Sequence, residues 1–241
     1  MTERTVHTMR VSFIIPAYNE EALLGRALDS VHAAAGAVQV PYEIIVVNDA
    51  STDRTGELAR DRGIRVLDVS CRQIAAVRNA GARAATGDVF VFLDADTVLP
   101  GAVLRAALEA LESGAVGGGA RVVMDERLPL ALRLFMVLFT LFYFRLMSWA
   151  AGCFVFVRRD AFEKAGGFDE RYFASEEIHF SRALKRHGRF VVLQQAVVTS
   201  NRKLHMYTPL QVLRPVWRVL RHGRRALQRR EGLDLWYEGR R

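Results

Sequence analysis

Residues 89–96 read Val-Phe-Val-Phe-Leu-Asp-Ala-Asp, a run of five apolar residues followed by a triplet that holds two carboxylates. An uninterrupted apolar run of this length is typical of a strand that is buried on both faces of a parallel sheet. Three comparable runs precede it, at residues 11–15, 43–47 and 64–69, and helical stretches separate them. This alternation predicts an α/β fold with an open, mostly parallel sheet and helices on both of its faces.

Short polar motifs follow three of these runs directly. Residues 16–20 read Pro-Ala-Tyr-Asn-Glu, residues 48–51 read Asn-Asp-Ala-Ser, and residues 94–96 read Asp-Ala-Asp. In open α/β sheets, ligands bind in the crevice outside the carboxyl ends of the strands. We therefore expect these three motifs to form the functional site.

The carboxylates of Asp94 and Asp96 lie at the lip of the strand over residues 89–93. Hard oxygen ligands suit Mg²⁺ or Mn²⁺, and such an ion is usually held by one or two carboxylates together with the phosphates of a substrate. An ion placed there would neutralise a diphosphate leaving group. Aspartate is also common in any loop that follows a strand, so the triplet alone does not establish a metal site.

Other polar residues near the strand ends admit two readings each. Asp49 offers a carboxylate that can accept from the edge of a nucleobase, while Ser51 and Thr52 can cap the helix that follows. Arg78 lies on a helical stretch before Gly81, where it suits recognition of a phosphate or a base, or is an ordinary solvated arginine.

Glu176 and Glu177 stand at the start of a helical stretch over residues 175–187. One of them complements the positive end of the helix dipole. The other suits a general base, which needs a carboxylate within hydrogen-bond reach of the hydroxyl that it deprotonates.

The later part of the chain supplies further elements. Gly117, Gly118 and Gly119 precede a strand-like run at residues 120–123, and another strand is predicted at residues 153–157. A helical stretch over residues 158–168 follows, with a stop at Gly-Gly before its end.

The net charge of +8 is concentrated at one end of the chain. Residues 201–241 hold eleven Lys or Arg against three Asp or Glu, so this tail carries the whole excess. Leucine and tryptophan are interleaved with the basic residues, which predicts a basic amphipathic helical tail that suits an anionic membrane surface at least as well as a polynucleotide. Packing on the body and contacts within an oligomer are the alternatives for this tail. The rest of the chain shows no basic groove, so no nucleic-acid partner is expected.

An apolar segment over residues 128–147 has an uncharged centre, residues 134–144, that is too short to span a bilayer. It suits a buried helix or an interfacial helix equally well. The first nine residues are polar and show no signal-peptide pattern, and the only two cysteines imply neither a disulfide framework nor a zinc site. These features favour a cytoplasmic protein that is peripheral to the inner face of the membrane.

With these motifs together, the sequence resembles the family 2 glycosyltransferases of the GT-A fold over residues 10–202. Residues 11–20 look like that family's opening strand and Pro-Ala-Tyr-Asn-Glu turn, and residues 46–55 look like its Val-Asp-Asp-Gly-Ser-x-Asp segment. Residues 76–96 look like its Ala-Arg-Asn-x-Gly helix leading into Leu-Asp-Ala-Asp. Residues 152–170 resemble its acceptor-side stretch, with Gly-Gly-Phe-Asp near the end.

The resemblance implies an inverting transfer of a sugar from a nucleotide diphosphate-sugar to an acceptor hydroxyl. It divides the chain into a disordered N-terminus at residues 1–9, a catalytic domain at residues 10–200 and the tail at residues 201–241. Within the catalytic domain, residues 10–98 would bind the nucleotide and residues 99–200 the acceptor. The donor is a UDP-, GDP- or dTDP-sugar, and the acceptor includes lipid-linked molecules among its candidates.

Roles for single residues follow from the same resemblance. Asp96 would be the direct ligand of Mg²⁺ or Mn²⁺, with Asp94 at the diphosphate beside it and His205 available to complete the site. Glu177 would be the catalytic base, with Glu176 as the alternative. The nucleotide would be contacted by four residues: Pro16, Ala17, Glu20 and Asp49. Arg78 would contact a base or phosphate, and Arg202 would reach the diphosphate from the C-terminal side.

The chain departs from the family pattern at three places. Asn48 and Ala50 replace the commoner Asp and Gly of the second motif, which leaves the base specificity open. Glu177 replaces the usual Asp and is longer by one methylene. His179 stands where an acidic residue is common.

Three other functions compete with the transferase reading. A nucleotidyltransferase usually carries a Gly-rich phosphate loop after its first strand, where this chain has Pro-Ala-Tyr-Asn-Glu. A dinucleotide-dependent dehydrogenase needs Gly-x-Gly-x-x-Gly at the same place, and that motif is absent. A non-catalytic protein that binds sugar nucleotides or membranes on the same fold would be expected to lose one of the carboxylates, and all of them are present.

Overall fold

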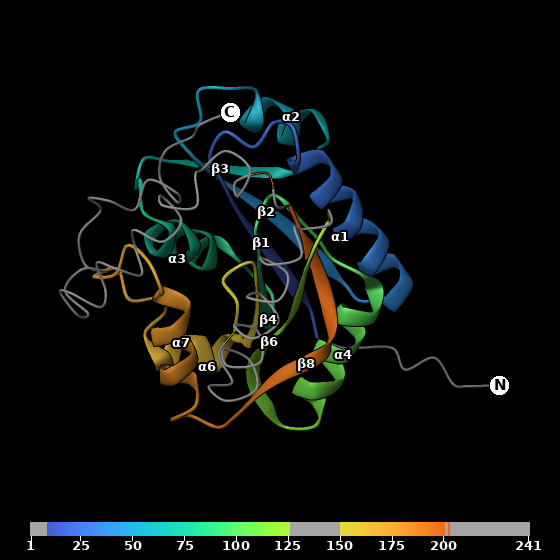
Figure 1. Ribbon diagram of the computed structural model, residues 1–241, viewed down its shortest axis with the longest axis vertical. Helices are drawn as coiled ribbons and strands as arrows, with labels where there is room; N and C mark the ends of the chain where they lie inside the picture. Colours follow the sequence, from blue (N-terminus) through green and yellow to red (C-terminus); the bar gives the residue numbers. More distant parts are fainter. Residues whose placement is uncertain (1–8, 126–149, 201, 203–241) are drawn as a thin grey trace, which may run out of the picture.

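The structure is a computed structural model that describes residues 9–125, 150–200 and 202 (Figure 1). Three predictions therefore lie outside the described residues: the disordered N-terminus at residues 1–9 apart from Met9, the apolar segment at 128–147, and the basic tail including His205, apart from Arg202. Within the described ranges, no helix is long and apolar enough to cross a membrane.

One mixed sheet forms the centre of the molecule, with the strand order β3-β2-β1-β4-β7-β6-β8-β5. The pairs β3–β2, β2–β1, β1–β4 and β6–β8 are parallel, and β4–β7, β7–β6 and β8–β5 are antiparallel. The strands are β1 Val11–Ala17, β2 Tyr42–Asp49, β3 Arg65–Val69, β4 Val89–Leu93, β5 Thr97–Val98, β6 Ala115–Met124, β7 Phe154–Arg158 and β8 Arg189–Thr199.

Helices cover both faces of this sheet, as the sequence predicts. One face carries α1, α2 and α4, and the other carries α3, α6 and α7, on opposite sides of the sheet in Figure 1. Their bounds are α1 Leu24–Val38, α2 Thr55–Asp61, α3 Ile74–Ala84, α4 Gly101–Glu112, α6 Arg159–Ala165 and α7 Glu176–Leu184. The prediction of an open α/β sheet is confirmed.

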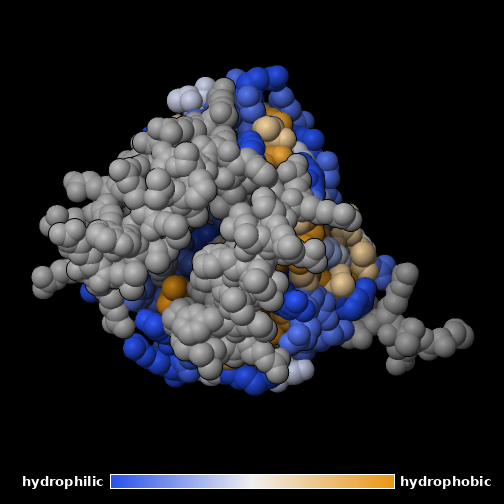
Figure 2. Space-filling view, viewed as in Figure 1, coloured by the Kyte–Doolittle hydropathy of each residue, from blue (hydrophilic) through white to orange (hydrophobic). Residues whose placement is uncertain are grey.

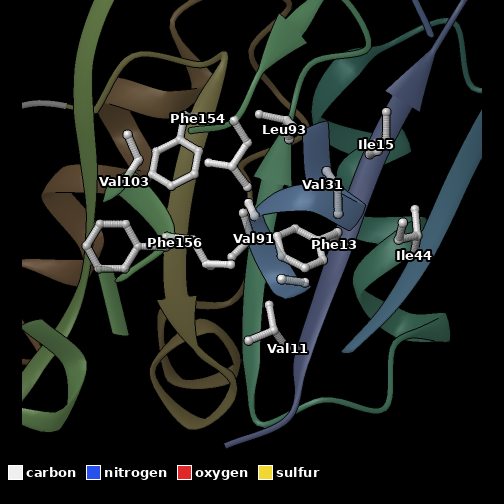
Figure 3. Packing of buried hydrophobic residues seen from close by; sticks show 14 of the residues in the cluster. Val11, Phe13, Ile15, Val31, Ile44, Val91, Leu93, Val103, Phe154 and Phe156 are labelled. Atoms are coloured by element: carbon white, nitrogen blue, oxygen red, sulfur yellow. The ribbon is translucent and has the colours of Figure 1, made fainter. Parts of the chain in front are cut away.

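Strand β1 shows why its sequence is apolar without alternation. Phe13 and Ile15 pack in the core beneath α1, and Ile14 between them packs in the core beneath α3. Figure 3 shows the first of these cores, where Phe13, Val31 and Val91 point toward one another. A strand with helices on both faces favours apolar side chains on both of them, and Ser12 is the one polar residue of β1.

Strand β3 differs from this pattern, and the prediction that it is buried on both faces was wrong. It is the edge strand beyond β2, and its side chains are partly or fully exposed. An edge strand has a neighbour on one side only, so fewer of its side chains are covered. Helix α2, which packs nearby, carries its charged residues outward, and Figure 2 shows a mostly hydrophilic surface over it.

The glycines at 117–119 lie inside strand β6 and do not precede it, which corrects the predicted strand start. A Cβ atom on Gly118 would lie 2.2 Å from the carbonyl oxygen of Val191 in β8. Close approach of the neighbouring backbone therefore requires glycine there. Strand β8 itself was not predicted, because a bulge near its middle interrupts the alternation of its side chains.

Helices α6 and α7 lie inside the predicted stretches at residues 158–168 and 175–187. Helix α6 ends at Gly166, which has a φ of 78° and so adopts the left-handed conformation that favours glycine at a helix end.

Candidate functional site

The three polar motifs of the sequence meet at one edge of the sheet. Strand β1 lies between β2 and β4 and runs parallel to both, so the carboxyl ends of the three strands point the same way. Residues 16–20, 48–51 and 94–96 are therefore neighbours, although about 80 positions separate the first from the last.

The turns after β1 and β2 are joined by direct hydrogen bonds, and we call residues 18–21 and 50–55 the turn pair. The Asn19 N–H donates to the Ser51 Oγ over 3.0 Å, and the Thr52 N–H donates to the Asn19 Oδ1 over 2.8 Å. The Glu20 N–H donates to the Thr55 Oγ1 over 2.8 Å. Ser51 therefore does not cap the next helix, because α2 begins at Thr55 without a side-chain cap.

Asp49 ends β2 and is 7% exposed. Its Oδ1 accepts from the backbone N–H groups of Cys71 and Arg72, over 2.7 and 3.0 Å. The guanidinium of Arg72 lies over the ring of Tyr18, 4.3 Å from its centroid. The carboxylate thus fastens the loop between β3 and α3 beside the turn after β1.

Pro16 and Ala17 are the last two residues of β1, and both are buried. Glu20, which follows in the turn pair, is 6% exposed. Its Oε2 accepts a hydrogen bond from Arg202 Nη2 over 2.7 Å. Arg202 reaches the site from beyond β8, where the Ser200 N–H donates to the carbonyl oxygen of Asp96 over 3.2 Å.

Asp94 and Asp96 stand together beyond β4. The hydroxyls of Thr97 and Thr199 each lie 3.3 Å from Asp96 Oδ1. Burial, together with the charges of both aspartates, raises the pKa of the Cys153 thiol well above its usual range. The two carboxylates therefore share one neighbour.

This pair of aspartates offers two carboxylates to a divalent ion. Among the described residues, no group of three or more His, Cys, Asp and Glu side chains could hold a metal by itself. Two hard carboxylates at a strand end nevertheless fit an ion that takes its remaining ligands from water and substrate phosphates, as Mg²⁺ usually does. The donor set fits Mg²⁺ or Mn²⁺ held jointly with a diphosphate.

Arg78 lies on α3 and is 2% exposed, so it is neither solvated nor at the surface. Its Nη1 donates to Glu176 Oε1 over 2.5 Å, and its Nη2 donates to Asp94 Oδ1 over 3.1 Å and to the Gly152 carbonyl oxygen over 2.8 Å. Burial alone would lower the pKa of this guanidinium, but the carboxylates of Glu176, Asp94 and Glu177 outweigh burial and raise it.

Close packing of α3 on the sheet keeps Arg78 at this depth. A Cβ atom on Gly81 would lie 2.4 Å from Ile14 Cγ2 and 2.8 Å from Val47 Cγ2. Glycine at this position therefore lets the helix approach β1 and β2 closely. The guanidinium carbon of Arg78 also lies 5.2 Å from the ring centroid of Phe168.

The two glutamates at the start of α7 differ in their surroundings. Glu176 is 5% exposed and is ion-paired with Arg78, whereas Glu177 is half-buried. A Cβ atom on Gly152 would lie 3.3 Å from Arg78 Nη2 and 3.8 Å from Glu177 Cδ. Glu177 therefore lies beside the same guanidinium, across the backbone of Gly152.

Helix α3 also holds the chain that leads into α7, which we call segment 166–177. Asn79 Nδ2 donates to the Phe168 carbonyl oxygen over 2.8 Å, and Asn79 Oδ1 accepts from the Phe168 N–H over 2.9 Å. Gln73 Nε2 donates to the Glu170 carbonyl oxygen. Neither Gln73 nor Asn79 was predicted as a site residue, although Asn79 stands in the same motif as Arg78.

His179 stacks on the ring of Tyr172, with 3.8 Å between the ring centroids and 16° between the planes. His205, the histidine predicted to complete the metal site, lies outside the described residues.

The comparison with protein families gives a match over more than half of the chain. Residues 12–166 match the family described as glycosyl transferase family 2. The match begins in β1 and includes the turn pair, Arg78 and both aspartates beyond β4.

Curated relatives share part of this region. The chain is 37% identical over 123 residues to a dolichol-phosphate mannosyltransferase of Pyrococcus furiosus, a match that covers 48% of this chain and 34% of the relative. It is 38% identical over 112 residues to an undecaprenyl-phosphate 4-deoxy-4-formamido-L-arabinose transferase of Aeromonas hydrophila, covering 43% and 34%. The matched region spans about a third of the length of these relatives.

Solved structures share the fold. The mannosyltransferase PcManGT of Pyrobaculum calidifontis, solved with GDP-Man and Mn²⁺, superposes with a TM-score of 0.65 at 24% identity, covering 82% of this chain and 58% of that one. Residues 1–349 of TarS from S. aureus, solved with UDP-GlcNAc, superpose with a TM-score of 0.64 at 20% identity, covering 80% and 59%.

Proposed function

The chain belongs to glycosyl transferase family 2, and from this premise we propose that it is an inverting glycosyltransferase that moves a sugar from a nucleotide diphosphate-sugar to an acceptor hydroxyl. The observation that carries the proposal is the convergence on Arg78 of Asp94, from the end of β4, and the two glutamates at the start of α7. One buried cation thus joins a candidate diphosphate site to a candidate base.

The nucleotide lies, in this proposal, over the carboxyl ends of β1 and β2. Asp49 would accept from the base through the carboxylate that already fixes the loop after β3, and Pro16 and Ala17 would form the wall beside it. Glu20 and its partner Arg202 would lie toward the diphosphate. The Asn48 Nδ2 already donates to Asp68 Oδ1 over 2.8 Å, so this side chain gives no indication of which base the site prefers. UDP-, GDP- and dTDP-sugars therefore all stay candidates for the donor.

Asp96, with Asp94 beside it, would hold Mg²⁺ or Mn²⁺ together with the diphosphate. When bound, such an ion neutralises the charge that develops on the departing nucleoside diphosphate. The buried Arg78 would fix the position of Asp94 in this site, because its Nη2 donates to Asp94 Oδ1.

Glu177 would be the general base. In the proposed step, the acceptor hydroxyl gives its proton to Glu177, its oxygen bonds to the anomeric carbon, and the bond from that carbon to the diphosphate oxygen breaks. Attack from the face opposite the leaving group inverts the anomeric centre. Glu177 suits this role because it is half-buried beside Gly152 and so more exposed than Glu176, which is buried against Arg78.

We extend the proposal to acceptor hydroxyls that are carried on lipid-linked molecules, because the names of two relatives contain the lipid carriers dolichol-phosphate and undecaprenyl-phosphate. The excess of basic residues in the tail at 201–241 supports peripheral contact with an anionic membrane, at its cytoplasmic face.

The proposal is tested by incubating the full chain with UDP-, GDP- and dTDP-sugars and Mn²⁺ or Mg²⁺. Thermal stabilisation and release of nucleoside diphosphate are measured for each donor. Asp96→Ala is the test variant, and Asp29→Ala is the matched control, because Asp29 is an exposed residue of α1 that forms a surface ion pair with Arg62.

Stabilisation and turnover with one class of donor, lost in Asp96→Ala and on removal of the metal but kept in Asp29→Ala, support the proposal and identify the donor. A chain that neither binds nor turns over any donor, with Asp96→Ala indistinguishable from wild type, contradicts it.

A further inference from the structure

Glu176 and Arg78 form an ion pair that is buried on both sides. Their side chains are 6% and 2% exposed, and 2.5 Å separates Glu176 Oε1 from Arg78 Nη1. Arg78 Nη2 then continues to Asp94 Oδ1. The three side chains form a chain of contacts from the start of α7 to the end of β4, which we call the Glu176–Arg78–Asp94 link.

Resting on the proposed function, we infer that Glu176 is a positioning residue: through Arg78 it sets the place of Asp94 on the donor side and the start of α7, with Glu177, on the acceptor side. It does not exchange a proton with substrate. The link makes the geometry of the two reacting partners depend on one guanidinium.

The surroundings of Glu176 support this role. Its carboxylate is in contact with a buried cation and has little exposed surface, so an acceptor hydroxyl cannot approach it as it can approach a partly exposed carboxylate. Removing one partner of a buried ion pair leaves the other charge uncompensated, which is far more disruptive than loss of a surface pair.

The start of α7 needs an anchor from outside the helix. Ser175, at the N-cap, has a φ of 63° and makes no side-chain capping hydrogen bond. A non-glycine residue in this conformation persists only where its surroundings hold it. The ion pair of Glu176, the next residue, with Arg78 restrains this backbone. It thereby fixes the direction in which the Glu177 side chain points from α7.

A double-mutant cycle between Arg78→Lys and Glu176→Gln tests the inference. Lysine keeps the charge of Arg78 but cannot reach Glu176, Asp94 and Gly152 together, because it lacks the planar fork of arginine. Steady-state kcat and donor KM are measured for both single variants and the double variant, with folding checked by circular dichroism. Arg83→Lys, an exposed arginine on the same helix, is the matched control.

We expect Glu176→Gln to lower kcat/KM for the donor by about 10- to 100-fold in the wild-type background but by less than about threefold in the Arg78→Lys background, since residues that act through a shared contact are not additive. In the Arg83→Lys background the full effect should persist. The donor KM should rise as kcat falls, because a displaced Arg78 guanidinium no longer positions Asp94 through its hydrogen bond to Oδ1.

Two results would overturn the inference. Equal effects of Glu176→Gln in the wild-type and Arg78→Lys backgrounds would show that Glu176 does not act through Arg78. A loss of kcat of about 10³-fold or more in both backgrounds, at unchanged donor KM, would make Glu176 itself the base. A wild-type chain that turns over no donor would instead contradict the proposed function, and the positioning role with it.

Discussion

The turn pair and segment 166–177 flank the same site but are held in different ways. The turn pair is fastened by several hydrogen bonds between residues of its own two loops, including Asn19 with Ser51 and Thr52, and Glu20 with Thr55. Segment 166–177 is also fastened from outside, by two side chains of α3 and by the residue at its N-cap: Arg78, Asn79 and Gln73.

This difference has a physical consequence. The hydrogen bonds of Asn19 in the turn pair lie at partly exposed positions, where water can replace a lost partner, whereas the contact of Glu20 with Thr55 is buried. Buried side chains that each hold a distant segment are not redundant, because their partners are left without water. Single substitutions at partly exposed positions of the turn pair should therefore lower the free energy of unfolding only slightly. Substitutions of the buried side chains that hold segment 166–177 should lower it more.

The largest expected effect is on kcat, and it distinguishes the acceptor side of the site from the donor side. Glu177→Gln removes the proposed base and should lower kcat by about 10²- to 10⁴-fold. Donor affinity, which depends on the other side of the site, should change little. Steady-state kinetics and donor titration measure the two quantities, with Glu163→Gln on the exposed face of α6 as the control.

A small effect of Glu177→Gln would break this assignment in an informative way. A phosphate acceptor is already ionised near neutral pH, since its second pKa is about 6, and needs no base. Full activity of the variant would therefore point to a phosphate oxygen as the nucleophile and contradict transfer to a hydroxyl.

The next effect concerns stability on the acceptor side. Asn79→Ala removes both hydrogen bonds to the buried backbone of Phe168, and the unpaired N–H and C=O should lower the free energy of unfolding by about 2–4 kcal/mol. Urea denaturation monitored by circular dichroism measures the change. A loss below about 1 kcal/mol would show that segment 166–177 does not depend on α3.

The matching substitution in the turn pair should cost less. Ser51→Ala removes the acceptor of the Asn19 N–H at a partly exposed position, and the expected loss is about 1 kcal/mol or less. The same denaturation experiment applies. A loss equal to that of Asn79→Ala would erase the contrast between the two sides.

The smallest effect has the opposite sign. Ala50 has a φ of 54°, a left-handed conformation that a residue with a Cβ adopts only at a cost, and the commoner residue of the family at this position is glycine. Ala50→Gly should stabilise the protein by about 0.5–1 kcal/mol, the relief of strain exceeding the added entropy of the unfolded chain. A lower melting temperature of the variant would contradict this account of the turn pair.

The sequence could predict much of the fold, because burial on both faces leaves a local signature. The strand over Val89–Leu93 was predicted with its observed bounds, and the helices α6 and α7 lie within their predicted stretches. Edge position and bulges leave a weaker signature, since they depend on which strand lies alongside. The exposure of β3 and the existence of β8 were missed for that reason.

For the candidate site, the sequence by itself determined which polar residues follow the strands and that they gather at one edge of the sheet. Only the tertiary structure decided their partners. Ser51 joins Asn19 and caps no helix, and Arg78 is a buried cation where the sequence admitted a solvated one. The partner of Arg78, Glu176, lies 98 positions away. Local periodicity reports which face of an element is apolar, whereas a contact over such a distance exists only after packing has brought the two elements together.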